Sequence, residues 1–208
     1  MKEESINKRK IQAANTKKRI FDMASQLVSK HGVEHISVDS IVKAAGISKG
    51  TFYVHYKSKD ELIVDLVNYY THTADMDYKS ISLSLKDTKS SLDFLLILAE
   101  EIADFIENRI GFENMKALYI SHLAKTIDTA SALNYSRYIY QIFNETIEKG
   151  IKTGELRSDI PVETLANHLI IAARGVVFEW CIRHPNLDLR ESLLTHFKIL
   201  VKGLCDKQ

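Results

Sequence analysis

Polar and cationic side chains gather between residues 48 and 59 at spacings that suit the binding of a nucleic acid. They offer hydroxyl, ammonium, phenol and imidazole groups: Ser48, Lys49, Thr51, Tyr53, His55 and Lys59. Such groups hydrogen-bond to base edges and to phosphate oxygens. Gly50 lies among them and weakens a helix by about 1 kcal/mol, a cost that makes sense where a side chain would block close approach to DNA. The segment therefore predicts a short helix that contacts DNA.

Ordinary structural roles are the alternatives for three of these residues. His55 also suits a satisfied histidine in a small core, and Lys49 and Lys59 also suit solvated surface lysines. Residue spacing alone leaves these alternatives open.

Two short helices joined by a glycine turn are expected to position these groups. Ser37 is a good N-cap for a helix that ends at Gly46, and it is also counted among the predicted DNA-binding residues. Ser48 caps the next helix, which reaches about Val54. At about 1.5 Å per residue this helix is about 10 Å long and fits a major groove about 12 Å wide. The succession is a helix-turn-helix pattern.

Longer helices flank this pattern. Apolar residues at helical spacing predict a first helix over about 16–30. Ser58 and Glu61 form a capping box that opens a fourth helix. Residues 1–12 are expected to be a flexible basic arm that touches phosphates or reaches a minor groove. A solvated tail is the alternative.

Residues 45–62 read AGISKGTFYVHYKSKDEL. This string resembles the DNA-binding domain of the TetR/AcrR family of bacterial transcriptional regulators, whose pattern is roughly A-G-V-S-x-G-x-x-Y-x-H-F-x-x-K-x-x-L. Ile47 and Tyr56 depart conservatively from Val and Phe, and Val42 stands where the family often has Ala. The resemblance covers about residues 16–66, a quarter of the chain.

The resemblance implies a role for each matching residue. The positions that face base edges or the nearby DNA backbone are Ser48, Lys49 and Thr51. The positions that contact phosphates are Tyr53, His55 and Lys59. Phe52 and Tyr56 are expected to pack inside the core of the three helices.

The charge distribution agrees with a DNA-binding head. Residues 1–60 hold 12 Lys and Arg against 6 Asp and Glu, a balance of +6, and residues 61–208 hold 16 against 21, a balance of −5. A basic head on an acidic body suits contact with a polyanion, and chance clustering is the alternative. The two cysteines, Cys181 and Cys205, form neither a disulfide framework nor a CxxC metal site, so a reducing compartment is expected.

The rest of the chain is also expected to be helical. No segment shows sustained alternation of period two, and two prolines and eight glycines are too few for a many-stranded fold. Further helices are predicted at about 89–108, 113–124, 130–152, 161–184 and from 188 onward. The predicted fold class is all-α: an N-terminal three-helix helix-turn-helix domain, residues 1–60, joined to a larger helical ligand-binding and dimerisation domain, residues 61–208.

A two-fold dimer is expected because one short recognition helix reads only a few base pairs, and paired half-sites lie about 34 Å apart. Apolar stripes on the last two helices are the candidates for the dimer interface: Leu169, Ala172, Ala173, Val176, Leu193, Phe197, Leu200 and Leu204. Two helices from each subunit would form a four-helix bundle, which resembles how the family dimerises. The alternative is that these stripes face the core of their own domain.

The family resemblance also implies an effector cavity among the central helices, which are rich in aromatic residues. An aromatic cavity with a few polar groups suits an aromatic or amphipathic small molecule. The expected lining residues are Tyr69, Met76, Phe94, Tyr119, His122, Phe143 and Trp180. Core packing is the alternative for each of them taken singly.

These features together predict a cytoplasmic, ligand-responsive transcriptional regulator, a repressor released from a palindromic operator by its effector. The sequence holds no GxSxG, HExxH, GxxxxGKS or GxGxxG motif, so no catalytic residue, metal site or cofactor is expected. No membrane span is expected either, because the apolar stretches fall short of about 20 residues. The alternatives are a constitutive DNA-binding or architectural protein without an effector, and a small helical enzyme.

Overall fold

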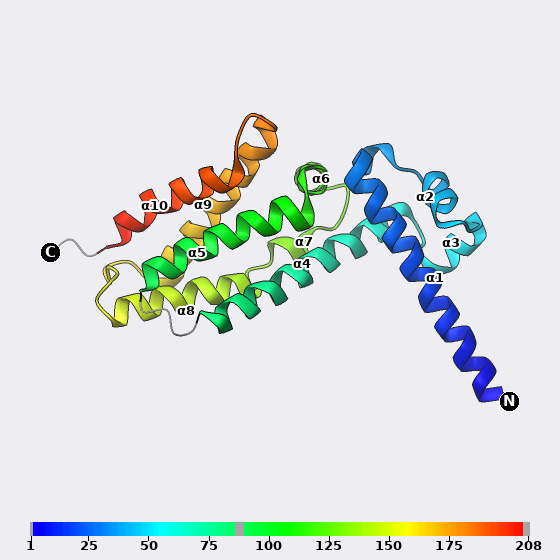
Figure 1. The fold of residues 1–208 in the computed structure, drawn as a ribbon, viewed down its shortest axis with the longest axis horizontal. Coiled ribbons are helices and arrows are strands. Elements are labelled where there is room, and N and C mark those ends of the chain that lie inside the picture. The colour runs from blue at the N-terminus through cyan, green and yellow to red at the C-terminus, as the bar shows by residue number, and fades with distance from the viewer. Residues whose placement is uncertain (1, 86–89, 206–208) are drawn as a thin grey trace. The chain divides into compact units, whose positions relative to one another are not determined.

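The structure, a computed structural model, describes residues 2–85 and 90–205, and these are almost entirely helical (Figure 1). They form two compact units that interleave along the chain. The first unit holds the residues up to Tyr69 together with Glu113–Thr129, and the second holds Tyr70–Phe112 together with the residues from Ala130 on. The chain therefore passes between the units three times.

The first unit begins with a compact group of helices. In order these are α1 (Lys2–His31), the 3-10 turn η1 (Val33–His35), α2 (Val38–Ala45), α3 (Lys49–His55) and the first part of α4 (Lys59–Ser84). Their apolar faces form a core whose most buried members are Ile20, Ala24, Ile41, Phe52 and Leu62, each 0% exposed. Most of α6 (Phe112–Ala124) completes the unit, and Glu113 lies so close to Gly32 that a Cβ added there would stand 3.1 Å from the carboxylate.

Four helices enclose the core of the second unit. They are α5 (Ser91–Asp104), α8 (Tyr138–Lys152), α9 (Val162–Arg183) and α10 (Leu189–Leu204). Helix α5 packs against α8 and α10, and α9 packs against the same two helices, so the four close into a ring. Gly150 of α8 permits close packing there, because a Cβ at this position would stand 2.6 Å from the side chain of Leu156.

Two predicted helices are divided in the structure. The prediction over 130–152 becomes α7 (Ala130–Leu133) and α8, because the Oδ1 of Asn134 accepts the Ser136 N–H at 2.9 Å and turns the chain between them. The prediction over 89–108 becomes α5, capped by Ser90, and the π-helical segment η2 (Phe105–Ile110), which ends at Gly111 with φ 78. Residue 89 lies outside the described residues.

Helix α1 begins at Lys2, whereas the sequence predicts a flexible arm over residues 1–12 and a helix only from about residue 16. Residues 7–15 are exposed, so they have no buried stripe from which a helix is predicted. They include Lys, Arg, Gln and Ala, which favour helix by intrinsic propensity. The described part of the expected arm is therefore helical, and residue 1 lies outside the described residues.

The predicted division at residue 60 differs from the two units in two places. The first unit continues along α4 to Tyr69, and it includes Glu113–Thr129 from much later in the chain. The second difference arises from packing of α6 near Gly32, a long-range contact that no local residue pattern encodes.

Helix α9 alone among the described helices is long and apolar enough, by length and composition, to cross a membrane. Over an 18-residue window of this helix the mean hydropathy is 1.3, and a core helix in a soluble protein passes the same test. In the second unit α9 packs against both α8 and α10.

Candidate nucleic-acid interface

Hydrogen-bonded caps define both helices of the helix-turn-helix. The Oγ of Ser37 accepts the Ser40 N–H at 3.2 Å, and the Oγ of Ser40 accepts the Ser37 N–H at 2.9 Å, so a reciprocal capping box opens α2. Gly46 ends α2 in the left-handed conformation, with φ 60 and ψ 41, which favours glycine. The Oγ of Ser48 then accepts the Thr51 N–H at 3.1 Å and opens α3. The predicted caps are confirmed.

One side of α3 anchors it in the first unit. Phe52 is 0% exposed and Tyr56, directly after the helix, is 2% exposed, as predicted. The Tyr56 hydroxyl donates to Asp65 at 2.9 Å, and Lys17 lies 3.2 Å from the same carboxylate and over the Tyr56 ring. Burial and the hydrogen bond to Asp65 raise the pKa of Tyr56 well above its usual range. These contacts tie α3 to α1 and α4.

The other sides of α3 are accessible. Ser48, Lys49 and Gly50 are exposed, and Thr51 and His55 are half-buried. Tyr53 is 54% exposed and Val54 is 80% exposed. The predicted contact positions of α3 are therefore available to a partner, and that the partner is DNA stays a prediction.

Lys49 is held by an acidic neighbour from the preceding helix. Its ammonium lies 2.7 Å from Asp39 of α2, and both side chains are exposed. The hydrogen bond to Asp39 raises the pKa of Lys49, so the side chain stays cationic. An exposed ion pair of this kind contributes little to stability, so a phosphate can replace Asp39 as its partner at small cost.

Lys59 lies in the first turn of α4, as the sequence predicts, and makes two hydrogen bonds that the sequence does not predict. Its ammonium donates to the carbonyl oxygens of Val33 at 3.1 Å and Ile36 at 3.2 Å, and the side chain is half-buried. Two of its three N–H donors therefore hold the connection between α1 and α2 against the first turn of α4. Lys59 therefore has a positioning role, and its expected contact with a phosphate stays a prediction.

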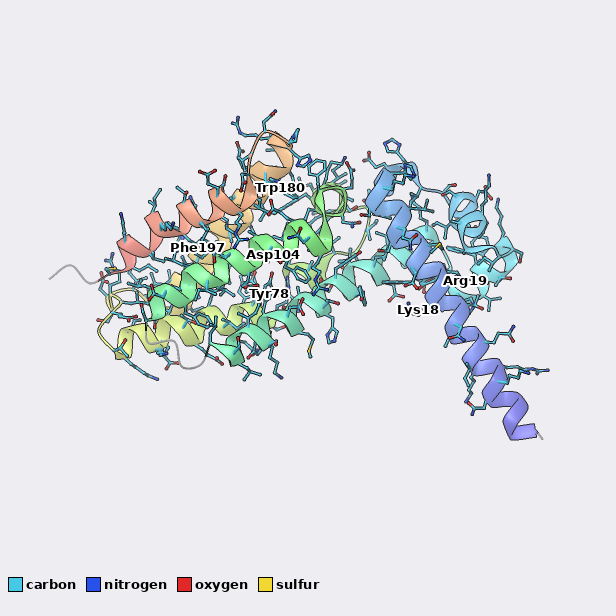
Figure 2. The ribbon with its side chains drawn as sticks, viewed as in Figure 1. Lys18, Arg19, Tyr78, Asp104, Trp180 and Phe197 are labelled. Carbon is cyan, nitrogen blue, oxygen red and sulfur yellow. The ribbon has the colours of Figure 1, made fainter. Side chains whose placement is uncertain are left out.

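Basic side chains continue along α1. Lys18 pairs with Asp22 at 2.6 Å, and Arg19 beside it is exposed; Figure 2 labels both on this helix. Further exposed cations nearer the N-terminus include Lys8, Arg9 and Lys10. Helix α1 therefore extends the cationic character of the first unit beyond its core.

The predicted effector-lining residues belong to two different units. Tyr69, Tyr119 and His122 lie in the first, where Tyr69 packs edge-on against Phe21 at 5.1 Å and His122 lies 2.6 Å from the Thr129 hydroxyl. The second unit holds Met76, Phe94, Phe143 and Trp180. Phe143 and Trp180 are 0% and 4% exposed, whereas Met76 is 53% exposed. Core packing also explains the burial of Phe143 and of Trp180, which Figure 2 labels, so an effector cavity lined by these residues stays a prediction.

Most of the predicted dimer-interface residues face their own core. Leu193 and Phe197 are 0% exposed, and Leu169, Ala173 and Leu204 are at most 8% exposed. Phe197 packs at 6.2 Å from Phe143 of α8, so Leu193 and Phe197 have no surface left for a second subunit while the unit is folded. Ala172, Val176 and Leu200 are half-buried. The stripe identified from spacing is therefore largely the inward face of α9 and α10.

Comparison with known proteins places the helix-turn-helix in a family. Residues 20–66 match the model of "Bacterial regulatory proteins, tetR family", and this range spans the helix-turn-helix and its flanking contacts. These residues form a TetR-family N-terminal domain. The resemblance expected from residues 45–62 is confirmed.

Relatives of the TetR-domain chain extend over nearly its whole length. The HTH-type transcriptional repressor KstR2 of Rhodococcus jostii is 24% identical over 89% of each chain. The HTH-type transcriptional regulator AcrR of Shigella flexneri is 24% identical over 94% of this chain and 92% of its own. The crystal structure of Bacillus subtilis FadR in complex with stearoyl-CoA has a TM-score of 0.70 and 17% identity, covering 89% of this chain and 98% of that one. The all-α fold class is thereby confirmed.

An ion pair within the second unit was not predicted from the sequence. Arg137, the N-cap of α8, contacts both carboxylate oxygens of Asp75 at 3.0–3.3 Å and donates to the Ala132 carbonyl at 2.9 Å. Tyr78, one turn further along α4, is 5% exposed and packs at 6.0 Å from Phe105. The sequence signal for this ion pair was the presence of two carboxylates, at positions 75 and 77, among apolar residues. No local pattern identifies Arg137 as the partner of Asp75.

Proposed function

We propose that this TetR-domain chain is a homodimeric transcriptional repressor that leaves a palindromic operator when a small molecule binds its second unit. The exposed face of α3 carries the proposal: hydroxyl, ammonium and phenol groups are held accessible by a helix whose other side is anchored by Phe52 and Tyr56. A helix presented in this way can enter a major groove.

The dimer is supported by an exposed apolar stripe on α9 that the sequence analysis passed over. Ile171 is 55% exposed, Phe178 40% and Ile182 61%, at intervals of seven and four residues, which place them on one helical face. Gly175 lies between them, and a Cβ there would meet no atom within 4 Å. Glycine inside a helix costs about 1 kcal/mol, so a glycine beside open space, as far as the described residues show, suits close approach of a second copy.

The effector is an aromatic or amphipathic small molecule. Support comes from the buried aromatic rings of the second unit, where Tyr78 packs against Phe105 and Phe143 against Phe197. Arg174 lies over the ring of Tyr140 at 5.6 Å and adds a cation to this aromatic surrounding. FadR of Bacillus subtilis was crystallised with stearoyl-CoA, an amphipathic molecule, which makes this compound a reasonable first probe.

Helix α4 is the candidate route between effector and DNA. It runs without interruption from Lys59, in the first unit, to Ser84, in the second. Lys59 binds the carbonyls of Val33 and Ile36, directly before α2. A movement of α4 would therefore displace the start of the helix-turn-helix, and an effector that favours the moved state would weaken DNA binding.

The proposed DNA-binding regulator has no enzymatic activity and acts in the cytoplasm.

Selection from a random duplex library tests this function. We expect enrichment of a palindrome whose half-sites lie about one helical turn apart. Lys49→Ala combined with Tyr53→Phe should weaken binding to the selected duplex at least tenfold, whereas Lys152→Ala, an exposed lysine of α8, should not. Failure to enrich any sequence would contradict the proposed function, and full affinity in the double variant would contradict the proposed interface.

A further inference from the structure

The outermost part of α3 carries no hydrogen-bonding group. At about 100° of rotation per residue, Gly50 and Val54 flank the direction opposite the buried Phe52. Val54 is 80% exposed, the highest value among the exposed large apolar residues of the described chain. Lys49 and Tyr53 lie to one side of this pair, and Thr51 and His55 lie to the other. The centre of the accessible face is therefore apolar, with polar flanks.

Nothing within the fold requires glycine at position 50. Its backbone is helical, and it is absent from the glycines with positive φ. A Cβ there would meet only the Ser48 Oγ, at an ordinary 3.8 Å. Gly50 has no side chain, and Val54 beside it has a branched apolar one. A surface that packs against α3 therefore comes close to the Val54 methyl groups.

We propose that Val54 reads the 5-methyl group of a thymine in each half-site of the operator, with Gly50 permitting the close approach. This inference rests on the proposed function and adds a determinant of base specificity to it. Thymine is the one base that displays a methyl group in the major groove. A valine at this position makes a favourable apolar contact with that methyl group. It has no hydrogen-bonding group for the polar edges of the other bases, so it favours thymine.

Uracil substitution tests the proposal atom by atom. The full-length protein is first used to select its duplex, and symmetric thymine pairs in that duplex are then replaced by uracil, which pairs identically but lacks the methyl. We expect one symmetric pair to matter, with about fourfold loss of affinity for each half-site, or roughly fifteenfold for both, as burial of a methyl-sized group implies. Val54→Ala should bind the thymine and uracil duplexes equally.

Leu123→Ala is the matched control, because Leu123 is also strongly exposed, at 69%, but lies on α6. It should retain the full uracil effect. An unchanged uracil effect in Val54→Ala would overturn the proposal and assign the methyl to another residue. Absence of a uracil effect at every thymine would overturn it as well. Both results leave the selected duplex intact and so differ from a failure of the proposed function, in which no duplex is selected.

Gly50→Ala examines the close approach separately. The added methyl group meets no obstacle in the protein and favours helix, so the first unit should keep or gain thermal stability. Affinity for the thymine duplex should nevertheless fall, and the uracil effect should shrink with it. Unchanged affinity in this stable variant would overturn the close approach on which the thymine contact depends.

Discussion

Lys59 either touches DNA or shapes the DNA-binding surface, and removing its ammonium group tests which role it has. Lys59→Met removes its hydrogen bonds to the carbonyls of Val33 and Ile36 while keeping most of its apolar volume. Because hydrogen bonds from charged groups contribute about 1.5–3 kcal/mol and this side chain is half-buried, we expect a loss of about 1–2 kcal/mol in the free energy of unfolding. Denaturant titration followed by circular dichroism measures it.

The salt dependence of DNA binding separates the two roles. A lost phosphate contact reduces the slope of log affinity against log salt by about 0.9. Lys59→Met should leave this slope unchanged, whereas Lys49→Met should reduce it if a phosphate displaces Asp39. If the Lys59→Met protein keeps its full stability but shows a reduced slope, Lys59 contacts a phosphate, as the sequence pattern implies.

Residue types predicted the caps and the buried side of the helix-turn-helix, but not the contacts of its individual side chains. Ser37, Ser48 and the buried Phe52 follow from capping and periodicity, which are local properties. The partner atoms of Lys59 lie 26 and 23 residues earlier in the chain, and no spacing rule encodes such a contact. The exposure of Val54 likewise depends on how α3 packs as a whole.

At the scale of elements, a single charge tests the proposed dimer contact on the outward face of α9. Phe178→Asp places a charge in the proposed apolar contact, at a cost of several kcal/mol if the charge is left unpaired. We expect a folded monomer, measured by light scattering and circular dichroism, with weakened affinity for the palindromic duplex because the two heads no longer bind as one unit.

Leu83→Asp is the control for this variant, since Leu83 is 50% exposed on α4 and should tolerate the charge without loss of the dimer. Phe197→Asp should instead unfold the second unit, because that side chain is 0% exposed. A Phe178→Asp protein that remains dimeric would place the interface elsewhere.

Periodicity located α9 and α10 but did not identify which stripe faces inward. Both helices carry apolar residues on two sides, one buried in the core of the second unit and the other exposed. Sequence spacing cannot rank two such stripes, because only the tertiary packing distinguishes them. For α1 the reverse holds, since residues 7–15 are helical although they are exposed and carry no buried stripe.

For the whole molecule, the proposed function requires a coupling free energy between effector binding and operator binding, so that each ligand weakens the binding of the other. If stearoyl-CoA or another screened amphipathic compound binds, calorimetry with and without the selected duplex should show weaker binding when DNA is present. Typical coupling is about 1–3 kcal/mol, which corresponds to about 5–150-fold. Linkage requires that the compound weaken DNA binding by the same factor.

Equal compound affinity in the two titrations would exclude α4 as a transmitting element for that compound. Lys59→Met offers a second check, because it disconnects the first turn of α4 from the residues before α2. The variant should retain compound binding, and the factor by which the compound weakens DNA binding should become smaller.

The threefold passage of the chain between its units has a thermodynamic consequence of its own. Residues 113–129 belong to the first unit but are tethered at both ends to the second. A folded second unit thus holds this segment at high effective concentration for docking near Gly32, much as a crosslink reduces the entropy lost on closing a loop. When residues 70–112 unfold, they become a long flexible connection between the two parts of the first unit. Any compound that stiffens the second unit should therefore raise the melting temperature of the DNA-binding unit as well, even before its affinity for DNA is considered.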